Sequence, residues 1–168
     1  AVSSVVVPSS LGRSSASAAT TDPVLAAVGD ISCAGGSKTT STTCQQVATA
    51  TLAKASDITA VQTLGDNQYY DGTAAQFAGG YAKSWGAVKA KTHPAAGNHE
   101  YNTPGATGYY GYFGSAAGDP ARGYYSYDLG AWHIVVLNSE IAFGSGSTQD
   151  TWFRNDLASH PARCTAAV

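Results

Sequence analysis

The chain has 168 residues, a length suited to one domain with a sizeable core. Only 12% of its residues are charged, and its formal net charge is −2 without long basic or acidic runs. This composition gives no electrostatic basis for binding nucleic acid or a membrane surface, and no apolar stretch reaches the ~18–20 residues of a transmembrane helix. The surface must be covered largely by small and uncharged polar residues, which favours a secreted, extracellular protein.

The first 22 residues are rich in Ser, Ala, Thr and Val and are low in complexity. Because the sequence contains no Met, even at position 1, we expect a processed N-terminus. We interpret residues 1–22 as a flexible lead-in, with the alternative that Val5-Val6-Val7 adds an edge strand. The predicted elements lie within residues 23–168.

Short runs of apolar residues predict three strands in the first half of the chain, over residues 24–28, 58–64 and 92–96. Helices are predicted between them, over residues 43–55 and 73–85. This alternation is typical of an α/β fold with a partly parallel sheet. The positions expected to face the core are Phe77, Tyr81 and Trp85, at helical spacing, and Val47, Leu52 and Ala53 on the other helix.

The pattern changes after residue 101. Residues 102–122 are rich in glycine and aromatics, and we predict a long ordered loop there. Gly130-Ala131 separates two apolar runs and predicts a hairpin. The remaining elements form the start of a second sheet: strands at 124–129 and 132–137, a helix at 148–159 and a strand at 163–168.

Three cysteines are present. Cys33 and Cys44 flank a loop rich in Gly, Ser and Thr, so we predict a disulfide between them, with two free thiols as the alternative. A disulfide is typical of an oxidising compartment. Cys164 is left without an expected partner.

Three short motifs follow the three predicted strands. They are Gly29-Asp30, Gly65-Asp66-Asn67-Gln68-Tyr69 and Gly97-Asn98-His99-Glu100. The carboxyl ends of parallel strands meet at one edge of a sheet, where ligands bind. One motif alone is typical of a turn. The three together predict a metal site.

Each candidate ligand has a chemical role in a two-metal hydrolytic centre, which needs one carboxylate to bridge two ions. Asp30 and Asp66 supply carboxylates, and Asp66 is the better bridge because further ligands lie near it. Asn98 offers an amide oxygen, and Tyr69 offers a phenolate three residues after Asp66. His99 points differently from its neighbour Asn98 and would face the substrate, where it would protonate the leaving oxygen.

The motif series resembles the calcineurin-like metallophosphoesterase superfamily, with its Gly-Asp, Gly-Asp-x-x and Gly-Asn-His-Asp/Glu motifs. It is more narrowly similar to secreted bacterial members of the purple acid phosphatase branch, in which a Tyr follows the second Asp by three residues. The similarity extends over residues 24–168, including Tyr124 to Glu140 and the helix with Gln149, Trp152 and Leu157. It implies an αββα sandwich of two mixed sheets, incomplete in this chain, so that residues 23–168 are the N-terminal part of the domain.

The resemblance also implies the site. Asp30, Asp66 and Tyr69 would ligate Fe(III), and Asp66 and Asn98 would ligate a second ion, Zn, Mn or Fe(II). His99 would act in catalysis, and Asn98 and His99 would contact substrate. The implied activity is that of a dinuclear phosphomonoesterase, in which a metal-bound hydroxide attacks small phosphate esters in line. We further expect the Tyr-rich run, through Tyr110 and Tyr112, to line the substrate approach.

The chain departs from the family in two places. Its first motif reads Asp30-Ile31-Ser32, where the broader superfamily has Asp-x-His. The family's later lone His and Gly-His-x-His are missing, and we interpret His93, His133 and His160 as structural. Three explanations stay open: an N-terminal portion of a longer enzyme, one piece of a nicked enzyme whose C-terminal fragment carries the histidines, or a short inactive relative. The alternative function is a non-catalytic extracellular binding module on the same fold.

Overall fold

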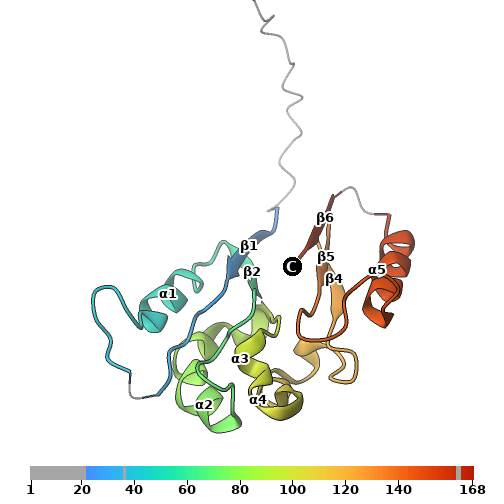
Figure 1. The fold of residues 1–168 in the computed structure, drawn as a ribbon. Coiled ribbons are helices and arrows are strands. Elements are labelled where there is room, and N and C mark those ends of the chain that lie inside the picture. Colours follow the sequence, from blue (N-terminus) through green and yellow to red (C-terminus); the bar gives the residue numbers. More distant parts are fainter. Residues whose placement is uncertain (1–21, 36, 162–163) are drawn as a thin grey trace, which may run out of the picture.

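A computed structural model describes residues 22–35, 37–161 and 164–168. The expected lead-in, apart from Asp22, and the alternative strand at Val5-Val6-Val7 lie outside these residues. The described part is a mixed α/β structure with two three-stranded sheets (Figure 1). No helix within it is long and apolar enough to cross a membrane.

The first sheet is parallel throughout its three strands, whereas the alternation of strands and helices predicted a partly parallel sheet and the family resemblance a mixed one. Its strands are β1 (Val24–Val28), β2 (Ile58–Thr63) and β3 (Thr92–His93), in the order β1-β2-β3. Each strand begins at or next to its predicted residue, and β3 is shorter than expected. Because the strands are parallel and neighbouring, their carboxyl ends lie side by side at one edge.

The helix predicted over residues 43–55 forms as the shorter α1 (Gln46–Leu52). The expectation that Val47 and Leu52 face the core is wrong, since they are 63% and 75% exposed. The third predicted core residue, Ala53, is buried, and so is Ala50. Since α1 packs against a short 3-10 helix (Trp85–Lys91), it approaches its neighbours with small side chains rather than large ones.

The helix predicted over residues 73–85 is broken in the structure. It forms α2 (Ala74–Gly79), two 3-10 helices (Tyr81–Lys83 and Trp85–Lys91), and a break at Gly80. A Cβ at Gly80 would overlap the side-chain amide of Gln68, which would have to move to make room for it. The three predicted core residues are nevertheless all buried: Phe77, Tyr81 and Trp85.

The long loop expected over residues 102–122 is wrong, because most of it is helical. The segment follows α3 (Asn98–Tyr101). It contains a 3-10 turn (Pro104–Ala106), α4 (Thr107–Phe113) and a second 3-10 turn (Gly114–Ala117). Gly108 lies so close to the Gly72 carbonyl that no side chain would fit there. This close approach lets α4 pack on α2 and bury its aromatic side chains.

The second sheet contains β4 (Tyr125–Leu129), β5 (Trp132–Val136) and β6 (Cys164–Ala167), in that order. The predicted hairpin is confirmed: β4 and β5 are antiparallel, and Gly130 adopts a φ of +60° in the turn. The last strand, β6, is parallel to β5. The predicted final helix forms as α5 (Thr148–Ser159), with Ser147 accepting a hydrogen bond from the Asp150 amide at its N-terminus.

The two sheets lie between helices. Figure 1 shows α1 beside the first sheet, α5 on the far side of the second, and the sheets between them. Tyr127 joins the sheets: its hydroxyl donates a 2.9 Å hydrogen bond to Gln62 on β2, and its ring stacks on His93 of β3 at 3.6 Å. The sheets are therefore held together by polar and aromatic contacts at their centre.

The predicted disulfide between Cys33 and Cys44 is present, with a Cα–Cα distance of 5.5 Å. It closes the loop that follows β1. Within the described residues Cys164 is exposed and forms no disulfide.

Candidate metal centre

The three motifs meet where the strands of the first sheet end. Asp30 follows β1, Asp66 follows β2, and Asn98 and His99 begin α3 shortly after β3. The backbone amide of Ile31 donates to the Asp66 carbonyl at 3.3 Å, which fixes the first loop against the second. The structure thus gathers residues from three motifs that are 32 to 69 positions apart in the chain by placing them at the ends of neighbouring parallel strands.

Both aspartates occupy an unusual backbone conformation. Asp30 has a φ of +58° and Asp66 a φ of +47°, in the left-handed region that residues other than Gly rarely adopt. Asp is among the residues that tolerate this region, because its short side chain bonds locally. Gly97 packs directly against Asp66, where a Cβ would overlap its carboxylate and its amide. Such conformations cluster at functional sites, where surrounding contacts hold them.

Tyr69 connects the two carboxylates. Its hydroxyl donates a short hydrogen bond to Asp30 Oδ1 and lies 3.3 Å from Asp66 Oδ2. Burial, the hydrogen bond to Asp30 and the charge of Asp66 together raise the pKa of Tyr69 well above its usual value. In the absence of a cation the phenol therefore keeps its proton.

His99 lies next to these groups. Its backbone amide donates to Asp66 Oδ1 at 3.1 Å, and its ring meets the ring of Tyr69 edge-on at 4.4 Å. Its Nδ1 is 2.6 Å from the Tyr70 carbonyl, which can only accept, so Nδ1 carries a proton. Its Nε2 lies 4.0 Å from Asp66 Oδ2. Asn98 precedes it with an exposed side chain.

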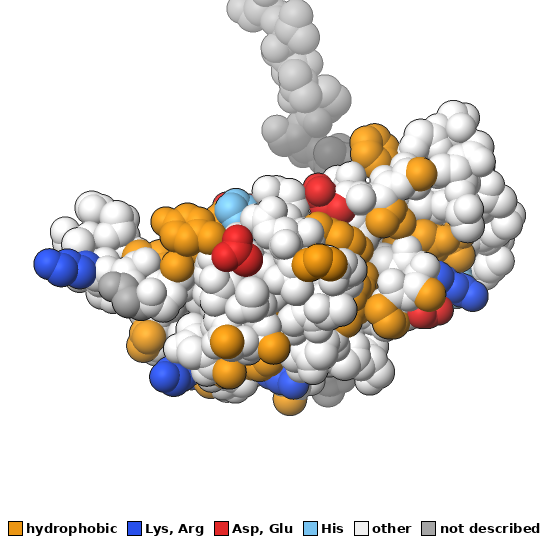
Figure 2. Space-filling model, turned by 60° about the horizontal axis from the view of Figure 1, so that its bottom comes forward, with side chains coloured by type: hydrophobic (Ala, Val, Ile, Leu, Met, Phe, Trp, Pro, Cys, Tyr) orange, Lys and Arg blue, Asp and Glu red, His pale blue; other side chains and the backbone are white. Residues whose placement is uncertain are grey.

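Apart from His99, the acidic groups of this site have no basic partner within the described residues. Among the described residues, no Lys or Arg forms an ion pair with Asp30 or Asp66. Figure 2 shows one face of the molecule on which a histidine lies near hydrophobic and acidic side chains, while the Lys and Arg side chains lie toward its edges. Two uncompensated carboxylates favour binding of a cation.

Glu100 holds the second and third motifs together. It is fully buried, and its carboxylate accepts from the amides of Gly97 at 2.8 Å and Gln68 at 3.0 Å, with Asn67 at 3.4 Å. Burial raises the pKa of Glu100, while these three hydrogen bonds oppose the rise. Sequence reasoning treated Glu100 only as part of a motif; the structure makes it the residue that positions both loops.

Ser32 stands where the broader superfamily motif has a histidine. Its hydroxyl is buried and donates to Gln68 Oε1 at 2.9 Å, and the Tyr81 amide donates to the same oxygen at 2.7 Å. Gln68 in turn donates to the Cys33 carbonyl at 3.0 Å. Ser32 therefore stabilises the loops through its hydrogen bond to Gln68 and does not contribute a metal ligand.

Tyr110 and Tyr112 are not brought to this site, which corrects the expectation that they line the substrate approach. Tyr110 is buried, and its hydroxyl lies 3.4 Å from that of Tyr101. Tyr112 stacks on Phe77 at 5.1 Å. The reason is that this run forms α4, whose aromatic side chains complete the core.

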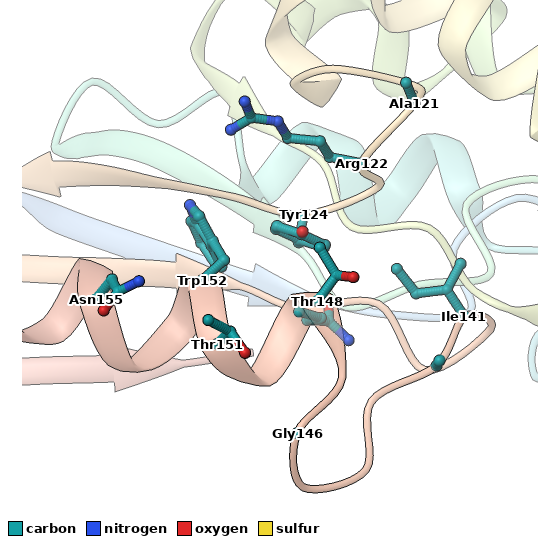
Figure 3. Close-up of a pocket in the computed structure, with 11 residues that line it drawn as sticks. Ala121, Arg122, Tyr124, Ile141, Gly146, Thr148, Thr151, Trp152 and Asn155 are labelled. Carbon is teal, nitrogen blue, oxygen red and sulfur yellow. The ribbon is translucent and has the colours of Figure 1, made fainter.

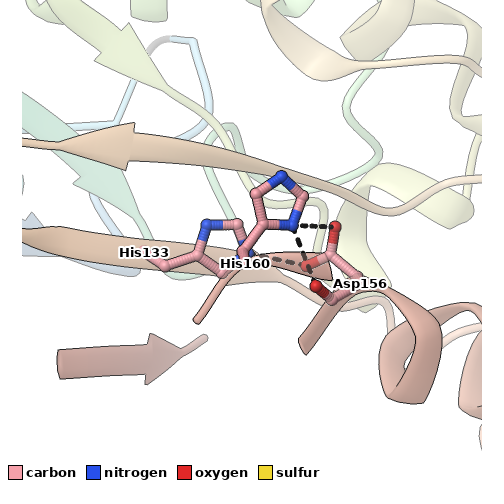
Figure 4. Close-up of side chains that lie close together, drawn as sticks. All are labelled: His133, Asp156 and His160. Carbon is pink, nitrogen blue, oxygen red and sulfur yellow. Dashed lines mark hydrogen bonds and ion pairs between the residues drawn. The ribbon is translucent and has the colours of Figure 1, made fainter. Parts of the chain in front are cut away.

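A second group of potential metal ligands lies on the other sheet, and sequence reasoning missed it. His133 on β5, Asp156 on α5 and His160 just after α5 bring ligand atoms within 4.8 Å of one another (Figure 4). The sequence signal was Asp156-x-x-x-His160, whose i, i+4 spacing places both residues on one helix face. The contribution of His133 could not be read from spacing, because it comes from a different element.

A cavity of about 790 Å³ lies apart from both groups. Figure 3 shows it between α5, the loop before β4 and the loop that joins β5 to α5, with Tyr124, Trp152 and Arg122 among the residues that line it. Arg122 lies 3.7 Å from Asp119, and the rings of Tyr124 and Trp152 are 4.6 Å apart. The cavity is lined by mixed polar and aromatic groups and, among the described residues, by no His, Cys, Asp or Glu side chain, so it does not replace the carboxylate site.

Comparison of the chain with models of protein families and with curated proteins finds no match in either. The geometry of the residues themselves therefore carries the functional argument.

Proposed function

We propose that the chain is a dinuclear metal-dependent phosphoesterase of the calcineurin-like type, similar to the secreted purple acid phosphatases. The observation that carries the proposal is the contact of the Tyr69 hydroxyl with both Asp30 and Asp66, at the ends of adjacent parallel strands and beside His99. Two sheets between helices support the αββα sandwich that this family has (Figure 1). The Cys33–Cys44 disulfide supports an extracellular location.

The residues fit a pair of metal ions. Their donors are two carboxylates, a phenol and an exposed amide, which suit Fe(III) on the Tyr69 side and Zn, Mn or Fe(II) on the Asn98 side. Asp30, Asp66 and Tyr69 would hold the first ion, and Asp66 and Asn98 the second. When bound, the ions supply a nucleophilic water at neutral pH and neutralise charge on the phosphate oxygens.

Neighbouring residues fix the ligand side chains in position before a metal ion binds. Gly97 and Glu100 fix the position of Asp66, so little reorganisation is needed when a cation or an anionic substrate arrives. The unpaired carboxylates repel a phosphate ester in the metal-free protein. A phosphate ester would therefore bind only after the metal ions have bound.

His99 is the group placed to move a proton. The Tyr70 carbonyl holds the Nδ1 proton, which directs Nε2 toward Asp66 and the space above it. A proton on Nε2 would pass to the leaving alkoxide as the phosphorus–oxygen bond breaks. General acid catalysis of this kind contributes roughly 10²- to 10⁴-fold in rate.

The test compares metal content and hydrolysis of p-nitrophenyl phosphate in the wild type, Asp66→Asn and the exposed control Asp57→Asn. We expect Asp66→Asn to lose metal at this site and to lose turnover, and Asp57→Asn to retain both. Equal metal content and activity in the three proteins would contradict the proposal and favour the alternative, a non-catalytic extracellular binding module.

Tyr69 provides a spectroscopic test that does not depend on turnover. Fe(III) bound to a phenolate absorbs visible light, so the iron-loaded wild type should be coloured and Tyr69→Phe colourless. The exposed neighbour Tyr70 is the matched control, and Tyr70→Phe should keep the colour. A band that survives Tyr69→Phe removes Tyr69 from the ligand set.

A further inference from the structure

We propose that His133, Asp156 and His160 bind one divalent metal ion of the zinc class, at a site separate from Asp30 and Asp66. Neither the motifs nor the proposed phosphoesterase function uses these residues. They lie on the second sheet and its helix, whereas the carboxylate centre lies at the end of the first sheet (Figures 1 and 4).

The geometry of the three ligands is close to that of a bound ion. His133 Nε2 lies 2.7 Å from Asp156 Oδ2, and His160 Nδ1 lies 3.4 Å from Asp156 Oδ1. Ligand atoms of a tetrahedral zinc ion are about 3.3 Å apart, given metal–ligand bonds of about 2.0–2.1 Å. Since all three ligand atoms already lie within 4.8 Å of one another, small side-chain rotations suffice to surround an ion.

A supporting shell of hydrogen bonds is also present. His133 Nδ1, the nitrogen that faces away from Asp156, lies 2.7 Å from Asp128 Oδ1 on the neighbouring strand β4. Ser126 donates from its hydroxyl to Asp156 Oδ1 at 2.8 Å. A carboxylate on the outer nitrogen of a histidine fixes the ring and raises its basicity, which is the usual arrangement around metal-ligating histidines.

Metal binding would replace hydrogen-bonded protons within this cluster. Both ring nitrogens of His133 lie 2.7 Å from carboxylate oxygens, Nδ1 from Asp128 and Nε2 from Asp156. A metal ion would take the place of the proton on Nε2, which is released to solvent, while the Nδ1 proton stays on the ring and is donated to Asp128. His160 Nδ1 also lies 2.9 Å from the backbone carbonyl of Asp156, so a metal ion bound to this nitrogen would likewise displace its proton to solvent.

The identity of the ion follows from the donor set and its exposure. Two imidazole nitrogens and one carboxylate oxygen suit zinc and similar borderline ions better than calcium or magnesium. The His133 side chain is 1% exposed and that of Asp156 is 7% exposed, whereas that of His160 is 42% exposed. The ion would therefore enter from the His160 side and keep a fourth position open to water. It would join the end of α5 to β5.

The test is zinc binding by isothermal titration calorimetry in an Asp66→Asn background, which removes the first centre. The double variant Asp30→Asn, Asp66→Asn serves as a second background, because it removes both carboxylates of the first centre. We expect one zinc ion per chain in either background. His160→Gln, at an exposed position after the helix, should remove this binding, and Asp150→Asn on the same helix should retain it. Asp128→Asn should weaken binding by roughly 10- to 100-fold.

A second measurement identifies the ligands. Cobalt(II) in place of zinc gives a visible spectrum whose intensity reports tetrahedral coordination, and this spectrum should disappear in His160→Gln. The alternative is that the cluster is only a hydrogen-bonded connection between α5 and β5. Zinc stoichiometry unchanged by His160→Gln, or no zinc uptake in either background, would overturn the proposal. The phosphoesterase proposal fails on a different result, namely metal content unchanged by Asp66→Asn.

Discussion

The backbone amide of His99 donates a 3.1 Å hydrogen bond to the carboxylate of Asp66, although 33 residues separate them. This bond exists because Gly97, two residues earlier, lets the chain pass against Asp66 without a side chain. The third motif is thus positioned by the second.

Gly97→Ala should displace Asp66. The new Cβ would overlap the carboxylate and the amide of Asp66, so one of the two loops must move. We expect a loss of roughly 1–3 kcal/mol in the free energy of unfolding, together with weaker metal binding. Gly79→Ala is the matched control, since a Cβ there meets nothing within 4 Å and Ala favours the helix. Urea denaturation and metal titration of both variants check this; equal effects would mean that the close packing at Gly97 does not matter.

Glu100→Gln should destabilise the loops even though it removes a buried charge. The carboxylate accepts from Gly97 on one oxygen and from Gln68 on the other, and a Gln side chain has only one oxygen to offer. The side-chain NH2 group of the Gln would then face a buried backbone N–H that has lost its acceptor, which costs about 1–3 kcal/mol. Urea denaturation measures the change, with the exposed Glu140→Gln as control. A Glu100→Gln protein as stable as the wild type would show that the hydrogen bonds are dispensable.

His93 should make the protein less stable in mild acid. Burial lowers the pKa of His93 below its usual value of about 6.5, so the unfolded chain takes up the proton first as the pH falls. The contribution of neutral His93 to the free energy of unfolding is therefore at its full value above about pH 6.5. This contribution decreases as the pH falls below that value. Denaturation between about pH 8 and pH 5 checks this.

The matched variant for this experiment is His93→Phe, which keeps an aromatic ring to stack on Tyr127 and removes the titrating group. Its stability should vary less with pH than that of the wild type over the same range. Parallel pH profiles for the two proteins would exclude His93 as the source of the dependence.

Removal of the disulfide should loosen the loop after β1. Cys33 and Cys44 are 11 residues apart, and closing a loop of this length stabilises the folded chain by about 3 kcal/mol in the entropic model. Cys33→Ser with Cys44→Ser should therefore lower the free energy of unfolding by about that amount. Because Gln68 donates to the Cys33 carbonyl, metal affinity at Asp30 should fall as well. Cys164→Ser, at an exposed cysteine, should change neither.

The strands and the hairpin were predictable because they depend on local sequence. Apolar runs of the right length end at Gly29 and Gly65, and Gly130 lies in a turn that needs its positive φ. The motif residues Asp30, Asp66 and His99 could also be expected together, since parallel strands deliver their ends to one edge.

The rest depended on packing between distant segments. Gly108 lowers helix propensity, yet α4 forms because that glycine lets it pack directly on Gly72. Helical periodicity correctly predicted a buried Ala53, but Val47 and Leu52 are exposed, because this segment packs against a neighbouring 3-10 helix through small side chains. His133 and His160 lie 27 positions apart and meet only because α5 packs on β5.

The buried hydrogen bonds of Gln68 and Glu100 have a kinetic consequence. They join loops that follow three different strands, so none of these loops can open without breaking bonds in the others. In native-state hydrogen exchange, the amides of Gln68, Gly97 and Tyr81 should therefore exchange at one common rate, as a single cooperative unit. Binding of a metal ion at Asp66 would then also slow the exchange of those amides in this unit that do not contact the ion.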